Sequence, residues 1–211
     1  MLHALETDGF TVFDGISTEQ SFRSLATSLG VVATQGNGDI VDRIYPLDAQ
    51  RARPRSFGSA YGAGAYPLHS DTAHWPLPAR LVLLRVIGDN RRPSTICDAS
   101  HLLSEMDDYN RRKIRQSVWF SNFGEQRFTC SMLFEHYGES VFRFDPQCMS
   151  PANPAAELVL EFLPQLLFRA AKPLSWEKDT VLAIANWRVL HGRGHPPLDE
   201  SMRELQRIYV K

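Results

Sequence analysis

Two short segments, far apart in the sequence, place the strongest constraint on how this chain folds. His69-Ser70-Asp71 follows a glycine-containing stretch, residues 57–68, and His191 lies in the segment Asn186–Arg193. In an extended strand alternate side chains share one face, so the His69 imidazole and the Asp71 carboxylate can point to the same place. If the distant His191 imidazole joins them, side chains from the two halves of the chain meet at one point.

Two imidazoles and one carboxylate form a ligand set for a metal ion. Such a set fills three corners of an octahedron and leaves three open, which suits Fe(II) in oxygenases. A structural zinc site would need four protein ligands. The alternative is a loop histidine, His69, beside a solvated Asp71. The context favours the metal, because His191 follows the β-prone run 180–185 and two spaced arginines, Arg203 and Arg207, come after it.

Length and composition predict one globular domain over residues 1–211. The chain is 43% hydrophobic and 22% charged, which is ordinary for a soluble protein. Its formal net charge of -1 gives no electrostatic reason to expect nucleic acid or an anionic membrane as a partner. No segment reaches the roughly 20 apolar residues that span a bilayer. The first eight residues do not read as a signal peptide.

The cysteines indicate the redox compartment. Cys97, Cys130 and Cys148 show no paired spacing. This argues against a disulfide scaffold or a zinc ribbon, and it predicts a cytoplasmic location.

Periodicity and turn residues predict many strands and few helices. A helix over 19–29 is expected between a Thr18 cap and Gly30, a second over 101–116 after a Ser100 cap, and a third from Asn153-Pro154, kinked at Pro164. Strands are expected at 10–13, 40–45, 80–87, 118–123, 127–134, 141–144, 180–185 and 203–210, with an irregular connection over 46–55. The sum predicts a mainly β (α+β) protein: a barrel of two packed sheets with helices against one outer face, a jelly roll.

With these residues in view, the chain resembles the TauD-like family of Fe(II)- and 2-oxoglutarate-dependent dioxygenases. That family includes taurine dioxygenase, gamma-butyrobetaine hydroxylase and clavaminate synthase. The resemblance runs from Gly9 to the C-terminus, and its strongest parts are residues 66–71, 94–99, 186–193 and 203–207. It implies a double-stranded β-helix of the jelly-roll or cupin-like type. It also implies Fe(II), with 2-oxoglutarate and O2 as cosubstrates.

The resemblance assigns roles residue by residue. His69, Asp71 and His191 match the metal ligands. Arg203 matches the arginine that holds the 5-carboxylate of 2-oxoglutarate, and Thr95 the threonine that hydrogen-bonds the same carboxylate. The family usually carries Gly-Gly-(Asp/Glu)-Thr at that place, whereas here Arg92-Pro93-Ser94-Thr95 stands instead.

The substrate side is less familiar. Strand alternation puts Arg203, Leu205 and Arg207 on one face, and Arg207 matches an arginine that meets an acidic group of the substrate in several relatives. A surface edge strand with solvated charges is the alternative. Trp75 is a candidate substrate wall, and Arg193 could support the cosubstrate or form a local contact.

The predicted function is oxidation, most simply hydroxylation, of an unactivated C–H bond of a small molecule such as an amino acid or a natural-product intermediate. Two other classes stay open: a metal-dependent hydrolase or isomerase on a cupin-like barrel, and a non-catalytic sensor of 2-oxoglutarate. A requirement for O2 and the release of succinate distinguish a dioxygenase from the hydrolase or isomerase and from the sensor. Whether the chain forms a homo-oligomer is left open.

Overall fold

A computed structural model describes residues 2–34, 38–45, 57–62, 64–88, 92–123, 126–195 and 204–211. Arg203 and the expected irregular connection over residues 46–55 lie outside these ranges.

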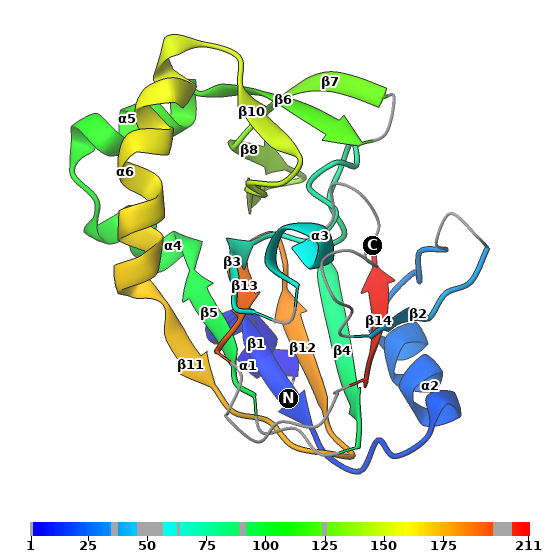
Figure 1. Cartoon of the computed structure of the whole chain (residues 1–211). Helices are drawn as coiled ribbons and strands as arrows, with labels where there is room; N and C mark the ends of the chain where they lie inside the picture. The colour runs from blue at the N-terminus through cyan, green and yellow to red at the C-terminus, as the bar shows by residue number, and fades with distance from the viewer. Residues whose placement is uncertain are drawn as a thin grey trace.

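Two antiparallel sheets form the lower half of the molecule in Figure 1. The larger has the order β1 (Phe10–Phe13), β12 (Val181–Ala185), β4 (Leu81–Ile87), β14 (Glu204–Val210) and β2 (Asp42–Ile44). The smaller has the order β11 (Lys172–Leu174), β5 (Ser94–Asp98), β13 (Val189–Arg193) and β3 (Tyr66–His69). Neighbours in each sheet come from distant parts of the chain, and the pairing of β13 with β3 brings the segments that carry His191 and His69 side by side.

The side chains of the larger sheet alternate between two apolar cores. On β4, Val82 and Leu84 pack with Ile96 and Val189 of the smaller sheet, so this core lies between the sheets. Leu83, on the same strand, points to the opposite face. Because both faces of β4 are covered, the strand reads as a continuous apolar run rather than an alternating one.

Two helices cover the outer face of the larger sheet. They are α1 (Leu2–Thr7) and α2 (Glu19–Leu29), and α2 buries Phe22 and Ala26 against that face. The Thr18 cap is confirmed: its hydroxyl accepts from the N–H of Ser21, and the Ser21 hydroxyl in turn accepts from the N–H of Thr18. The helix ends at Gly30, as expected.

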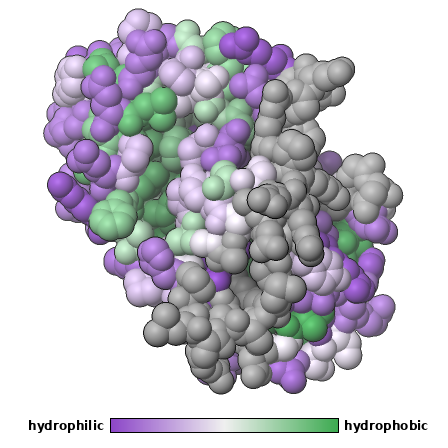
Figure 2. Space-filling view, viewed as in Figure 1, coloured by the Kyte–Doolittle hydropathy of each residue, from purple (hydrophilic) through white to green (hydrophobic). Residues whose placement is uncertain are grey.

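A second lobe lies above the two sheets and consists of the chain between β5 and β11 (Figure 1). Its helices α4 (Ala99–Glu105), α5 (Asp108–Gln116) and α6 (Pro154–Ala170) surround a core that includes Trp119, Met132 and Leu163. Outward-facing Phe168 on α6 is 84% exposed, and Figure 2 shows apolar side chains gathered on this side. The strands of the lobe are β6 (Val118–Phe123), β7 (Gln126–Ser131), β8 (Leu133–His136), β9 (Glu139–Phe142) and β10 (Met149–Pro151).

The lobe corrects the expectation that all helices lie on one outer face. In the described ranges, α1 and α2 pack there, whereas α4 to α6 build the separate core of the lobe. A short helix, α3 (Phe57–Tyr61), precedes β3.

Boundaries inside the lobe also differ from expectation. The helix predicted over 101–116 is two helices, and the cap of the first is Asp98 rather than Ser100, because the Asp98 carboxylate accepts from the N–H groups of Ser100 and His101. Asp107 caps the second. The strand predicted over 127–134 is divided between β7 and β8. The start of α6 after Asn153 is confirmed.

In the described part of the chain, no helix combines the length and the apolar character needed to cross a membrane.

Candidate metal centre

The two histidines of the centre are direct cross-strand partners. His69 is the last residue of β3 and His191 is the middle residue of β13, and their Cα atoms pair in the antiparallel register. Residues paired in this way point to the same face of the sheet. The ring centroids are accordingly 4.7 Å apart. Both side chains face the space between the two sheets, on the same face as Ile96.

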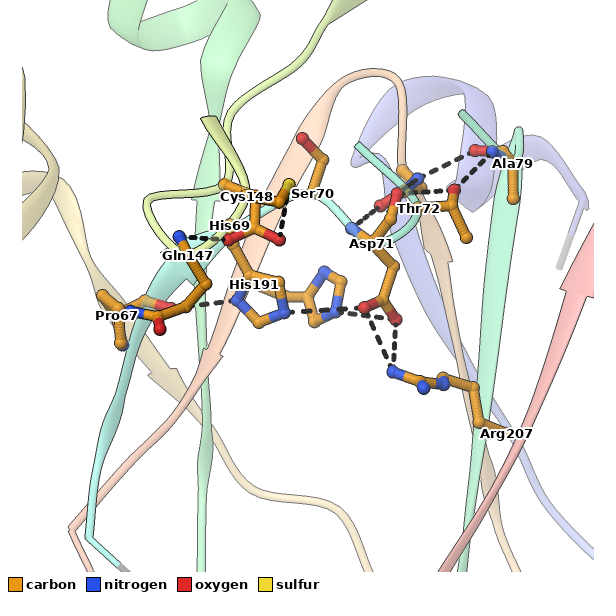
Figure 3. A network of polar contacts seen from close by, with 12 residues as sticks. Pro67, His69, Ser70, Asp71, Thr72, Ala79, Gln147, Cys148, His191 and Arg207 are labelled. Atoms are coloured by element: carbon orange, nitrogen blue, oxygen red, sulfur yellow. Dashed lines mark hydrogen bonds and ion pairs between the residues drawn. The ribbon is translucent and has the colours of Figure 1, made fainter. Parts of the chain in front are cut away.

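Asp71 reaches the same place from just beyond the end of β3. Its Oδ1 lies 3.6 Å from His69 Nε2, and its Oδ2 lies 3.6 Å from His191 Nε2. All three side chains are buried, and Figure 3 shows them pointing toward one another. The predicted convergence of His69, Asp71 and His191 is therefore observed.

The geometry and chemistry of these groups fit a metal ion. One ligand atom from each residue lies within 4.8 Å of the other two, so a single ion with bonds of about 2 Å fits between them after small adjustments. His69 Nδ1 lies 3.0 Å from the carbonyl oxygen of Pro67, which can only accept. Nδ1 therefore carries the proton, and the lone pair of Nε2 faces the centre.

Electrostatics keep the carboxylate ionised. Burial acts to raise the pKa of Asp71, but the Arg207 guanidinium and the two imidazoles hold it well below its ordinary value. Burial lowers the pKa of His191, which favours the neutral, metal-binding form. For His69, burial acts in the same direction, but the adjacent Asp71 carboxylate outweighs it and raises the pKa.

Arg207 approaches the centre from the opposite sheet. On β14, Leu205 and Arg207 face the space between the sheets, as strand alternation predicted. One terminal nitrogen of Arg207 lies 3.1 Å from both carboxylate oxygens of Asp71, and the other lies 2.6 Å from Asp42 Oδ2. Its Nε is buried and has no hydrogen-bond partner among the residues that the structure describes. The arginine is thus a neighbour of the candidate ligands and not a solvated edge residue.

Thr95 lies on the other face of the smaller sheet. The register pairs His191 with Ile96, and it pairs Gly192 with Thr95. Since side chains alternate along β5, Thr95 points away from the face that carries His191. This geometry does not favour the expected contact between Thr95 and a cosubstrate at the centre. The sequence could not reveal this, because the register between β5 and β13 decides the face.

Trp75 and Arg193 have local partners. The Trp75 ring packs against Tyr209, with 5.6 Å between ring centroids, and also lines a surface cavity of about 770 Å³ with Pro76, His136 and Trp187. None of the three candidate metal ligands lines that cavity. Arg193 donates to the carbonyl oxygens of Gly62 and Gly64 and lies over the ring of Tyr66, so it fixes the approach to β3.

Two acidic residues near the centre were missed by the sequence reasoning. Asp42 was assigned only to a strand, and its pairing with Arg207 depends on the β2–β14 register. Asp145 directly follows the strand expected over 141–144. It is buried, which raises the pKa of its carboxyl group, and the charge of His69 partly offsets this effect. An acid inside an apolar strand was the available signal for Asp42, and for Asp145 there was none.

Comparison with known proteins places this geometry in a family. The sequence profile of the family described as "Taurine catabolism dioxygenase TauD, TfdA family" matches residues 1–209. No curated protein sequence matches at a significant level.

Several solved structures share the fold at low sequence identity. An asparagine oxygenase in complex with Fe(II), 2S,3S-3-hydroxyasparagine and succinate has a TM-score of 0.81 at 16% identity, covering 99% of this chain and 77% of that one. The non-heme iron oxygenase OrfP, in complex with Fe and alpha-ketoglutaric acid, has a TM-score of 0.74 at 19% identity, covering 100% and 78%. PvcB from Pseudomonas aeruginosa has a TM-score of 0.73 at 17% identity, covering 99% and 78%.

At these identities the solved structures establish a shared fold, whereas the profile covers nearly the whole sequence. Together with the buried His69, Asp71 and His191, the match shows that this chain belongs to the taurine catabolism dioxygenase TauD, TfdA family.

Proposed function

We propose that this chain is a non-haem iron(II)- and 2-oxoglutarate-dependent dioxygenase that oxidises, most simply by hydroxylation, an unactivated C–H bond of a small molecule. The observation that carries the proposal is the convergence of His69, Asp71 and His191 in a buried site of a TauD, TfdA family chain. Three protein ligands leave three positions of an octahedral ion for a chelating cosubstrate and O2.

When bound, iron(II) with 2-oxoglutarate and O2 supplies the oxidising power that no side chain can supply. The protein residues hold and shield that chemistry. Two neutral imidazoles and one carboxylate leave a single net positive charge on an iron(II) ion, so an anionic chelator is still attracted. The apolar residues between the sheets restrict the access of water to the centre. We propose that the two sheets form the double-stranded β-helix implied by the family resemblance.

The cosubstrate and substrate residues are also proposals. Arg203 remains the proposed partner of the 2-oxoglutarate 5-carboxylate. Arg207 is proposed to bind an anionic group of the substrate. In support, its buried Nε–H has no partner among the described residues and can still donate a hydrogen bond. Trp75 is proposed as a substrate wall through its position beside Tyr209.

The proposed substrate class is an amino acid or a related small molecule. Support comes from the ligands of structures with a similar fold: the asparagine oxygenase was solved with 2S,3S-3-hydroxyasparagine, and OrfP with (3S)-hydroxy-L-Arg. From the length and composition of the sequence we also propose that the chain forms a single domain and that it is located in the cytoplasm.

A two-stage experiment tests the function. Anaerobic addition of Fe(II) and then 2-oxoglutarate is expected to produce a weak visible charge-transfer band, which the His191→Ala variant should lack. On admission of O2, a panel of amino acids should include compounds that increase succinate release. Turnover of a substrate without O2 would favour a hydrolase or isomerase instead. Binding of 2-oxoglutarate without any succinate over a broad panel would favour a sensor.

The role of Arg207 needs its own measurement, because the residue also contacts Asp71. Arg207→Ala should abolish substrate-stimulated succinate release while the affinity for 2-oxoglutarate is retained. Metal affinity is measured in parallel. Equal loss of substrate and 2-oxoglutarate binding would contradict the assignment.

A further inference from the structure

Within the described part of the chain the backbone of Asp71 has no strand partner, although its side chain is a candidate metal ligand. Strand β3 ends at His69, and the Ser70 N–H donates to the Phe144 carbonyl in the lobe. A buried peptide group needs hydrogen-bond partners, so the direction of Asp71 has to be fixed by something other than a sheet ladder. Two side chains provide those bonds, Asn186 and Thr72.

Asn186 uses its whole amide group on this segment. Its Oδ1 accepts from the Asp71 N–H at 2.8 Å, and its Nδ2 donates to the Asp71 carbonyl at 2.9 Å and to the Ala79 carbonyl at 2.8 Å. The residue is 1% exposed, so no water replaces these partners without rearrangement. One amide therefore closes the loop between Asp71 and Ala79 at both ends.

The position of Asn186 in the chain connects this loop to the third ligand. Asn186 directly follows β12, and β13, which carries His191, begins three residues later. The Asn186 N–H is itself held by the carbonyl of Arg80. The same side chain thus ties the loop that begins at Asp71 to the connection that leads into His191.

Thr72 makes the second contact in a strained conformation. Its φ is 57°, and the other non-glycine residues with positive φ in the described chain are Tyr137 and Asp179, neither of which is buried. A β-branched residue is rarely found there. The Thr72 hydroxyl donates to the Asp71 carbonyl at 2.6 Å and accepts from the Ala79 N–H at 2.7 Å. Figure 3 shows Thr72 and Ala79 beside Asp71. Strain that neighbours hold in place in this way is typical of functional sites.

We infer that Asn186, assisted by Thr72, is a positioning residue that fixes the Asp71 carboxylate relative to His191. The inference rests on the proposed function only in taking these residues as metal ligands. It gives Asn186 a role in the geometry of the centre.

The test uses Co(II) as an anaerobic probe, with Asn186→Ala compared with Trp187→Phe. The control is adjacent and buried, and it loses one hydrogen bond to the same loop, from Trp187 Nε1 to the Pro78 carbonyl at 2.9 Å. It contacts the loop without bonding to Asp71. Loss of a group that orients a ligand typically lowers metal affinity about 10- to 100-fold. Asn186→Ala should show that loss and an altered visible Co(II) spectrum at saturation, and Trp187→Phe should show neither.

Thr72 supplies a second route if Asn186→Ala does not fold. Thr72→Val removes the hydroxyl and should weaken Co(II) binding, whereas Thr72→Ser retains the hydroxyl and should preserve it. Wild-type protein that binds no Co(II) would overturn the proposed function itself. If the wild-type protein binds Co(II), and folded Asn186→Ala or Thr72→Val binds it with the same affinity and the same spectrum, the positioning role alone is overturned.

Discussion

Gly192 allows β13, which carries His191, to lie close to β3, which carries His69, and an alanine at this position would disturb that contact. A Cβ at this position would lie 2.7 Å from the carbonyl oxygen of Tyr66, 3.0 Å from that of Pro67 and 2.7 Å from Thr95 Oγ1. Real Cβ atoms essentially never approach within 3.0 Å, and two of these neighbours are backbone atoms that cannot rotate aside. In Gly192→Ala, β3 therefore has to retreat from β13 by a few tenths of an ångström.

That displacement acts directly on the candidate metal centre. The Pro67 carbonyl also accepts from His69 Nδ1, so the strand that moves carries both a ligand and the group that orients it. Metal sites have to be held within about 0.5 Å of their working geometry. We expect Gly192→Ala to lower Co(II) or Fe(II) affinity by about 10-fold or more, as for other losses of ligand orientation. Overpacking should also lower the free energy of unfolding by about 1–3 kcal/mol.

Gly138→Ala is the control that separates the loss of metal affinity from the loss of stability. Gly138 lies in the β8–β9 turn with φ of 82° and no neighbour within 4 Å of an added Cβ. The variant should lose about 1 kcal/mol of stability from backbone strain, with unchanged metal affinity. Metal titration followed by absorption, and urea unfolding of the metal-free proteins, give both quantities. Wild-type metal affinity in Gly192→Ala would refute the reasoning.

Two further changes test the electrostatics and the packing. Burial raises the pKa of Asp145 from its ordinary 3.8, so the folded state binds this proton more tightly. The protonated Asp145 carboxyl contributes to stability below the ordinary pKa of 3.8, and this contribution is lost as the pH rises through the higher pKa of the folded state. Asp145→Asn should therefore gain stability relative to wild type as pH rises, in urea unfolding with a chelator. Asp107→Asn should show the opposite trend, because the Asn110 N–H lowers the pKa of Asp107; parallel curves would contradict both assignments. Phe22→Ala, at a fully buried position, should cost about 3–5 kcal/mol in the same assay, whereas Phe168→Ala, at an exposed one, should cost little.

Features set by a few neighbouring residues could be predicted from the sequence. Thr18 and Asn153 cap helices because their side chains bond to N–H groups three residues ahead, which is a local matter. The expected Ser100 cap was wrong because Asp98, two residues earlier, is also a good capping residue and accepts from the N–H groups of Ser100 and His101. His69 and Asp71 were identifiable because their spacing and their chemistry agree.

Features set by strand register could not be predicted. The pairing of β5 with β13 decides that Ile96, and not Thr95, shares a face with His191. The pairing of β2 with β14 brings Asp42 to Arg207. Asn186 reaches Asp71 across more than a hundred residues of sequence. Each contact depends on where distant strands stop, and no local pattern records that.

Anomalous diffraction from crystals loaded anaerobically with Fe(II) or Mn(II) tests the metal centre most directly. We predict one strong peak at about 2 Å from His69 Nε2, His191 Nε2 and one Asp71 oxygen, with no fourth protein ligand. A metal bound elsewhere, or a closed shell of four protein ligands, would contradict the proposed oxygenase centre.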